Sequence, residues 1–225
     1  RFGKKSIRNV DAGNKDILLH SEASFSKSWP EIIWFFCITP PIVGGKTTIC
    51  DGIKLWKQLE TGTKEFFLTN PILYKLKIPI GKKNPNKDNQ KWFINEIGMG
   101  NSYINWKKGT LNTELLRFPV QLGRNLKDLC FANHLFVSLK SEPQILSRTL
   151  INNKKIPTKY LREIKDKAKK LTFEISWNKN DLIMIDNKRF MHGRKTYPSN
   201  DPRDIVNIQT EKANFSYGST LITKN

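Results

Sequence analysis

The sequence predicts a mainly β fold, a β-sandwich or barrel core decorated with a few helices. Short segments rich in β-branched and aromatic residues recur along the chain and are separated by Pro, Gly, Asn and Asp. Helical periodicity is clear in only two places, and no internal repeat is present. With 225 residues and 38% hydrophobic content, the chain is long enough to bury one sizeable core.

In the first half of the chain, β-forming residues gather in four segments: 17–22, 32–39, 47–50 and 72–80. The sequence "TPPIVGGK" separates the second from the third, because its two Pro and two Gly break regular structure. Residues 51–60, "DGIKLWKQLE", are expected to form a helix that begins at Asp51 as its N-cap. Residues 81–90 are polar and indicate a loop.

The second half contains the clearest helix, over residues 157–171. Its apolar residues are spaced as one buried stripe, with Lys and Asp outside: Leu161, Ile164, Ala168 and Leu171. Four further segments are typical of strands: 134–139, 172–177, 181–187 and 204–210. Residues 91–127 show no clear pattern.

The net charge of +19 raises the possibility of a nucleic-acid partner. The basic residues are mostly lysines scattered along the chain, without an Arg-rich cluster interleaved with aromatic residues, so a solvated basic surface is the favoured interpretation. No apolar run is long enough to span a membrane as a helix. The three cysteines, Cys37, Cys50 and Cys130, lack metal-binding spacing and indicate reduced, buried thiols in a cytoplasmic protein.

Two of the three histidines occur in suggestive surroundings. In "LLHSE", His20 and Glu22 are two residues apart, so on a strand both side chains would project from one face. Such a pair can offer two ligands to one metal ion, although a His-x-Glu pair also occurs by chance on surface strands. His192 follows a strand and the turn-forming "DNKR", and it could supply the third ligand.

These motifs, in this order, resemble the TauD/TfdA family of Fe(II)- and 2-oxoglutarate-dependent dioxygenases. The resemblance rests on His20-x-Glu22, the "GGKT" of residues 44–47, "DN…HGR" and a downstream Arg, and it covers about residues 20–60 and 172–212. The segment from His20 to Asp51 is most similar to the clavaminate-synthase-like and SyrP-like branch. The resemblance implies a double-stranded β-helix, the jelly roll of cupin-like proteins.

The resemblance also implies the roles of the site residues. His20, Glu22 and His192 would be the catalytic iron ligands, since two His and one carboxylate on one face of the metal form the facial triad of non-haem iron oxygenases. Arg203 would bind the distal carboxylate of 2-oxoglutarate, and Thr47 would add a hydrogen bond. Dioxygen would be the remaining cosubstrate.

Other roles for these residues stay open. Arg194 is the rival of Arg203, although it follows His192 too closely to reach the same spot easily. Thr47 could be an ordinary strand threonine. His134 is expected to be a packed or surface residue. Asp186 and Asn187 are expected to shape a turn.

We therefore expect an oxygenase that couples the decarboxylation of 2-oxoglutarate to hydroxylation, or another oxidation, of an unactivated C–H bond. By analogy, the substrate would be a small polar molecule, such as an amino acid that is free or bound to a carrier protein. The whole chain, residues 1–225, is expected to be one domain whose N-terminal part is short or missing. Residues 91–172 would be an insert or lid within it.

Two functions from other classes compete with this prediction. A non-catalytic jelly-roll binding protein would not consume 2-oxoglutarate when iron is supplied. A basic nucleic-acid-binding or nucleic-acid-modifying protein would bind DNA or RNA with a steep dependence on salt. The sequence contains neither a recognition helix nor an aromatic stacking platform, so a nucleic-acid partner is not expected.

Overall fold

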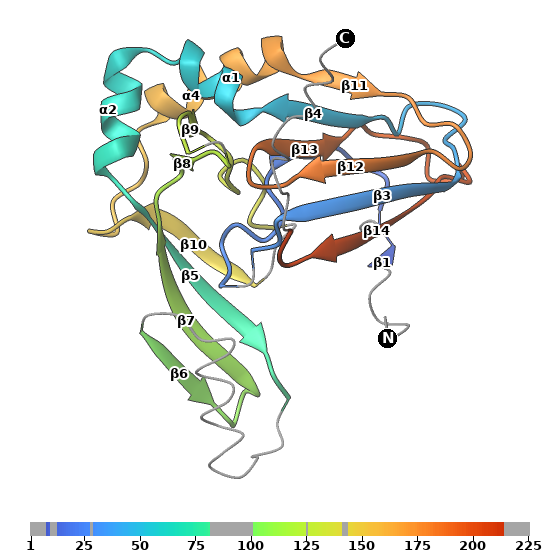
Figure 1. Cartoon of the computed structure of the whole chain (residues 1–225). Coiled ribbons are helices and arrows are strands. Elements are labelled where there is room, and N and C mark those ends of the chain that lie inside the picture. The colour runs from blue at the N-terminus through green and yellow to red at the C-terminus, as the bar shows by residue number, and fades with distance from the viewer. Residues whose placement is uncertain are drawn as a thin grey trace, which may run out of the picture.

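Two four-stranded antiparallel sheets face each other and form the centre of the fold (Figure 1). The computed structural model describes residues 8–9, 13–27, 29–81, 101–124, 126–140 and 144–213. The first sheet has the order β1 (Arg8–Asn9), β14 (Asp204–Thr210), β3 (Ile32–Thr39) and β12 (Leu182–Asp186). The second has the order β11 (Phe173–Ile175), β4 (Thr47–Asp51), β13 (Phe190–Arg194) and β2 (Ile17–His20).

Successive strands of this core alternate between the two sheets. β2 and β4 belong to the second sheet and β3 to the first, and the same alternation continues from β11 to β14. Apolar side chains of both sheets meet in one cluster that contains Ile33, Phe35 and Cys37 from β3 and Ile49 from β4. This winding is that of a double-stranded β-helix, so the predicted jelly-roll fold is confirmed.

The second sheet is covered on both faces, which places its central strands inside the protein. All five residues of β4 are buried. Cys50 of β4 and Met191 of β13 point away from the first sheet, into a larger apolar cluster. That cluster includes residues of three helices: α1 (Gly52–Gln58), α2 (Thr61–Thr69) and α4 (Thr158–Leu171). Because parts of β4 and β13 pack on both sides, their positions are strongly constrained.

A third antiparallel sheet extends away from the jelly roll (Figure 1). Its order is β10 (Ile145–Leu150), β5 (Ile72–Pro79), β7 (Thr110–Arg117) and β6 (Ser102–Asn105). A two-stranded sheet, β8 (Gln121–Leu122) and β9 (Leu129–Cys130), lies beside α1. Residues 101–117 of the predicted insert are thus part of this third sheet, and the division of the chain into one domain with a lid stays a prediction.

Most predicted elements are present, and the structure adds several that were not predicted. The Asp51 side chain caps α1 by accepting hydrogen bonds from the backbone of Ile53 and Lys54, at 2.9 and 3.3 Å. The buried stripe of α4 packs as expected, with Ile164 and Ala168 fully inside. The sequence did not predict α2, β1, β9, β10 or β13, and it showed no pattern in residues 91–127, which contain β6, β7 and β8. The predicted strand over residues 134–139 is wrong, since residues 131–137 are buried without belonging to a strand, and the predicted strand over 17–22 ends at His20.

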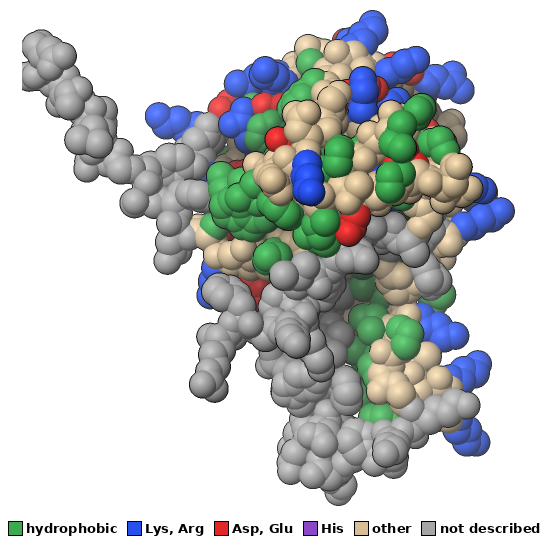
Figure 2. Space-filling view, turned by 90° about the vertical axis from the view of Figure 1, so that its right-hand side faces the viewer, with side chains coloured by type: hydrophobic (Ala, Val, Ile, Leu, Met, Phe, Trp, Pro, Cys, Tyr) green, Lys and Arg blue, Asp and Glu red, His purple; other side chains and the backbone are tan. Residues whose placement is uncertain are grey.

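The surface agrees with a solvated basic exterior. Figure 2 shows Lys and Arg side chains scattered over one face, among acidic and apolar groups. All three cysteines are buried and free of disulfide bonds, as expected. Within the described residues, no helix has the length and apolar character needed to cross a membrane.

Candidate iron site

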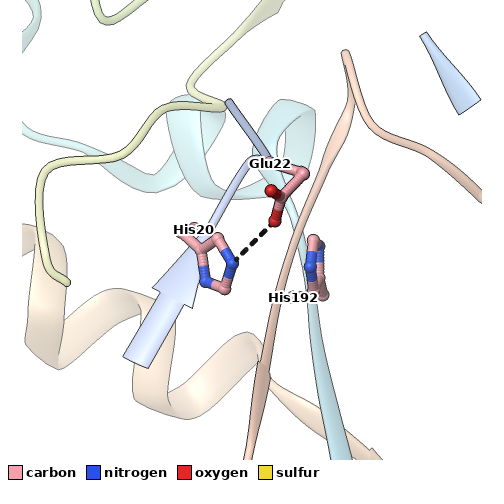
Figure 3. Close-up of side chains that lie close together, drawn as sticks. All are labelled: His20, Glu22 and His192. Atoms are coloured by element: carbon pink, nitrogen blue, oxygen red, sulfur yellow. Dashed lines mark ion pairs between the residues drawn. The ribbon is translucent and has the colours of Figure 1, made fainter. Parts of the chain in front are cut away.

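Three side chains from two strands and a turn converge at one end of the jelly roll (Figure 3). His20 ends β2, Glu22 lies in the turn that follows, and His192 is in the middle of β13. One ligand atom from each residue lies within 4.8 Å of the other two. β2 pairs directly with β13, with His20 opposite His192, so backbone pairing brings together two residues 172 positions apart in the sequence.

The pairing of His20 and Glu22 has a different basis from the one predicted. We expected both on one face of a strand, but the strand ends at His20 and Glu22 approaches from a turn. The turn is needed because Ser21 faces inward and is fully buried, donating a hydrogen bond to the backbone of Asn187 at 2.6 Å. The expected convergence of the two side chains is therefore found, whereas its proposed geometry is wrong.

The hydrogen bond of His20 determines which of its ring nitrogens faces Glu22. Nδ1 lies 2.8 Å from the carbonyl oxygen of Leu18, and a carbonyl can only accept, so Nδ1 carries the proton. In the neutral ring, Nε2 then presents a lone pair to the Glu22 carboxylate, 3.4 Å away. Two electron-rich atoms so placed require a proton or a cation between them, and a metal ion satisfies this requirement.

The ionisation states also suit a metal. Burial and the neighbouring His20 lower the pKa of His192 to about 3, so the ring is neutral and keeps a lone pair for coordination. Burial by itself would raise the pKa of Glu22, but the neighbouring His20, His192 and His134 lower it to about 2. Nδ1 of His192 is buried without a hydrogen-bond partner in the described part of the chain. The donor set of two neutral imidazoles and one carboxylate fits iron(II).

Asn187 holds the Glu22 turn in place, a role that the sequence analysis did not assign. Its amide oxygen accepts from the backbone N–H of Glu22 at 2.8 Å, and its amide nitrogen donates to the carbonyl of Glu22 at 3.0 Å and to that of Pro30 at 2.8 Å. Asn187 is completely buried and lies five residues before His192. It therefore ties the turn carrying Glu22 to the turn that leads into β13, the strand carrying His192. The predicted turn at residues 186–187 was the available signal.

Replacing Asn187 with alanine tests this role. The change leaves the buried backbone of Glu22 and Pro30 unpaired, so we expect the free energy of unfolding to fall by about 1–3 kcal/mol. Iron affinity should also fall, by roughly 10–100-fold, since the residue orients a ligand from outside the coordination shell. Denaturant unfolding of the apoprotein and metal titration measure the two effects.

Asn133 provides a matched control for this prediction. It is also buried, and its side chain binds the backbone of Pro119 and Leu135 at 3.0 and 3.1 Å. Asn133→Ala should destabilise the fold comparably while leaving iron affinity close to that of the unmodified protein. Equal iron affinity in both alanine variants would contradict the assignment of Asn187.

His134, the third histidine, is packed, as the sequence predicted. It is 1% exposed, and its ring lies edge-on to His20 with centroids 5.0 Å apart. Phe25 contacts its other side at a centroid distance of 4.8 Å. His134 thus supports the ring of His20.

Arg203 lies just before β14, at the end of the jelly roll that holds the β3–β4 loop. Its Nε donates to the carbonyl of Gly45 at 3.0 Å, and its guanidinium lies over the ring of Tyr197. No carboxylate within the described residues forms an ion pair with it. Burial lowers the pKa of Arg203, and Arg194 lowers that pKa further. A partly buried guanidinium without an anionic partner suits an incoming carboxylate.

Gly45 explains why the "GGKT" sequence precedes β4. It adopts a positive φ of 59°, and a Cβ at this position would lie 2.8 Å from Cδ of Arg203. Any larger residue would therefore be strained and would displace the arginine. Thr47, two residues later, is buried, and its hydroxyl accepts a hydrogen bond from Trp177 at 3.0 Å. The hydroxyl proton of Thr47 can still be donated to another acceptor.

Arg194, the rival of Arg203, is 4% exposed. It donates to the carbonyl of Lys15 at 2.9 Å and lies over the same Tyr197 ring. These contacts link β13 to the segment before β2, which is a structural role. The geometry favours Arg203 as the anion-binding arginine.

Comparisons with known proteins show a family match and structures of the same fold. The sequence profile of the Taurine catabolism dioxygenase TauD, TfdA family matches residues 3–209. A curated protein, 3-((Z)-2-isocyanoethenyl)-1H-indole synthase of Fischerella ambigua, is 22% identical over 197 residues, which are 87% of this chain and 63% of that protein. The chain thus spans less than two thirds of this relative.

Solved structures share the fold at low sequence identity. PvcB from Pseudomonas aeruginosa superposes with a TM-score of 0.59 and 13% identity, over 91% of this chain and 63% of PvcB. A second structure describes PvcB as an Fe, alpha-ketoglutarate dependent oxygenase from an isonitrile synthetic pathway. AAD-2, in complex with Mn(II) and N-oxalylglycine, has a TM-score of 0.56 and 16% identity, over 86% of this chain and 62% of AAD-2.

Proposed function

Because the chain belongs to the TauD/TfdA family, we propose that it is an Fe(II)- and 2-oxoglutarate-dependent dioxygenase. The observation that carries the proposal is the convergence of His20, Glu22 and His192 within 4.8 Å inside a jelly roll. The metal and cosubstrate are supported by the iron and alpha-ketoglutarate of PvcB and by the Mn(II) and N-oxalylglycine of AAD-2. The finer placement in the clavaminate-synthase-like and SyrP-like branch stays a prediction.

The residues of this chain have distinct tasks in the proposed reaction. Bound iron(II) would supply the activation of dioxygen, coupled to the decarboxylation of 2-oxoglutarate. His20, Glu22 and His192 would hold the metal, with the other coordination positions available to cosubstrates. Arg203 fixes the distal carboxylate of 2-oxoglutarate, and the Thr47 hydroxyl donates to the same cosubstrate. Phe35, whose ring centroid lies 5.3 Å from that of His192, helps to exclude water from the interior.

For the substrate, we propose a small polar molecule, namely an amino acid that is free or bound to a carrier protein. The names of two similar proteins refer to isonitrile chemistry, which supports testing isonitrile derivatives of amino acids as well. We also propose that the predicted insert, residues 91–172, covers the substrate. Of the aromatic residues in the predicted insert, Trp92 lies outside the described residues, while Tyr103 is 63% exposed on β6.

A succinate assay tests the proposed activity. Full-length protein supplied with iron(II), 2-oxoglutarate and oxygen should form succinate, and a panel of free, carrier-bound and isonitrile-bearing amino acids should identify a compound that increases the rate. Glu22→Ala, which removes a ligand, is the negative control and should form none above background. Succinate formation that is equal in both proteins, or absent from both, would contradict the proposal and, if absent, favour a non-catalytic binding protein.

A further inference from the structure

Two cationic side chains lie on the indole of Trp29, close to the proposed iron site. Nζ of Lys188 is 3.6 Å from the ring centroid, and the guanidinium carbon of Arg117 is 5.8 Å from it. Trp29 belongs to the loop after Glu22, Arg117 ends β7, and Lys188 lies in the turn between β12 and β13. Three segments distant in sequence thus meet at one aromatic ring.

These two cations lack acidic partners. Within the described residues, neither Arg117 nor Lys188 forms an ion pair with a carboxylate. Arg117 donates one hydrogen bond, from Nη2 to the carbonyl of Ser26 at 2.9 Å, and its Nε is buried without a partner. The nearby carboxylates of Glu31 and Asp186 are both held by Arg124, at 3.1 and 2.9 Å. The group therefore has positive charge and hydrogen-bonding capacity that the protein itself does not use.

The arrangement is costly in the absence of an anion. Burial lowers the pKa of Lys188 to about 8; the charges of Arg117 and Arg124 add to this decrease, while the carboxylates of Glu31 and Asp186 partly offset it. Burial also lowers the pKa of Arg117. Half-buried like charges repel each other and lose hydration, and cation–π contacts with one indole offset only part of this cost. A bound anion would remove the repulsion and satisfy Nε of Arg117.

The position of the pair suits a substrate. The Trp29 indole N–H donates to Oγ of Ser21 at 2.8 Å, and Ser21 directly precedes Glu22. Lys188 directly follows Asn187, whose side-chain amide accepts a hydrogen bond from the backbone N–H of Glu22 and donates one to its carbonyl. The pair is thus joined, through Trp29–Ser21 and through Asn187, to the turn that carries Glu22. An anion held there would place the rest of a small molecule near the iron.

We propose that Arg117 and Lys188 bind a carboxylate of the substrate and that Trp29 forms a flat wall for its apolar part. The guanidinium supplies two parallel donors and the ammonium a compact positive charge. Within the described residues, the Arg203 side chain contacts the carbonyl of Gly45 and the ring of Tyr197, and neither Arg117 nor Lys188, so we assign the carboxylates of cosubstrate and substrate to separate sites. This assignment rests on the proposed oxygenase function. It implies that the substrates of the oxygenase are carboxylic acids.

Reductive labelling of lysines tests the site without knowledge of the substrate. The whole protein is treated with 4-carboxybenzaldehyde or with benzaldehyde and cyanoborohydride, and each labelled lysine is quantified by peptide mass spectrometry. Lys159 is the internal reference, since its Nζ also lies over an aromatic ring, that of Tyr160 at 4.7 Å, but on the exposed side of α4. The ratio of labelling by 4-carboxybenzaldehyde to labelling by benzaldehyde should be about tenfold higher at Lys188 than at Lys159.

Two variants separate anion binding from general reactivity. Arg117→Gln should remove the preference at Lys188, while Arg117→Lys, which keeps the positive charge, should retain most of it. An equal preference at Lys188 and Lys159 in the unmodified protein, or an unchanged preference in Arg117→Gln, would overturn the assignment. Succinate formation measured on the same preparation tests the oxygenase function separately. If succinate forms but the labelling preference is absent, only the proposed carboxylate site is rejected. If the labelling preference is present but no succinate forms, only the oxygenase function is rejected.

Discussion

His192→Ala should lose tightly bound iron, with the largest effect of any single substitution considered for this protein. Removing one of three ligands should weaken iron binding by more than the roughly 10–100-fold that follows from altering residues outside the coordination shell. The remaining pair, His20 and Glu22, lies at the end of β2 and in the following turn, and it cannot enclose a metal without the ring from β13. Iron stoichiometry by elemental analysis after gel filtration measures the loss.

His134→Ala is the matched control for this experiment. His134 is equally buried and contacts His20, but it is not among the three converging ligands. This variant should keep near-stoichiometric iron, with at most a moderate loss of affinity from the looser packing around His20. Unchanged tight binding in His192→Ala, or a larger loss in His134→Ala, would show that the metal ligands have been assigned incorrectly. Circular dichroism should accompany both measurements to confirm folding.

Arg203→Gln should have the second largest effect, a loss of 2-oxoglutarate affinity with iron binding unchanged. Losing a charge-assisted hydrogen bond to the distal carboxylate should cost about 1.5–3 kcal/mol, or roughly ten- to a hundredfold in affinity. Anaerobic titration of 2-oxoglutarate into the iron-loaded variant, followed through its weak visible charge-transfer band, measures this change.

Arg194→Gln distinguishes the two arginines that contact Tyr197. Arg194 binds the carbonyl of Lys15, so its replacement should lower the free energy of unfolding more than it affects cosubstrate affinity. Within the described residues, the Arg203 side chain contacts the carbonyl of Gly45, in the β3–β4 loop, and the ring of Tyr197, but no neighbouring strand. If Arg194→Gln damages 2-oxoglutarate binding and Arg203→Gln does not, the cosubstrate arginine is Arg194.

The chemical identity of the proposed site could be predicted from the sequence because it depends on rare residue types in a fixed order. The chain has three histidines, and two of them lie in motifs that resemble one family, which the match over residues 3–209 confirms. Strand segments such as 32–39 and 204–210 were also predictable, since β-branched and aromatic residues there are bounded by strong turn signals. The helix over residues 158–171 was visible through its apolar stripe.

Other features depend on contacts between distant segments. The prediction of a strand at residues 134–139 was wrong because an apolar run can be buried as irregular backbone when neighbouring elements cover it, and residues 131–137 pack in this way. The helix over residues 61–69 was missed because only Thr63 and Phe67 are fully buried, which leaves a weak periodic signal. β13 is short and contains Gly193, and its strand state follows from pairing with β2 and β4 on either side.

The sequence by itself determined the family, the jelly-roll fold and the candidates for metal and cosubstrate ligands, because these follow from local patterns and residue chemistry. Only the tertiary structure decided how the candidates meet. It placed Glu22 in a turn held by Asn187, not on a strand beside His20. It also left Arg203 without an acidic partner in the described part of the chain, while giving Arg194 a structural contact. It also brought Arg117 and Lys188 to Trp29. These contacts join residues up to about 170 positions apart. They arise because strands pair across the fold, and local sequence does not encode that pairing.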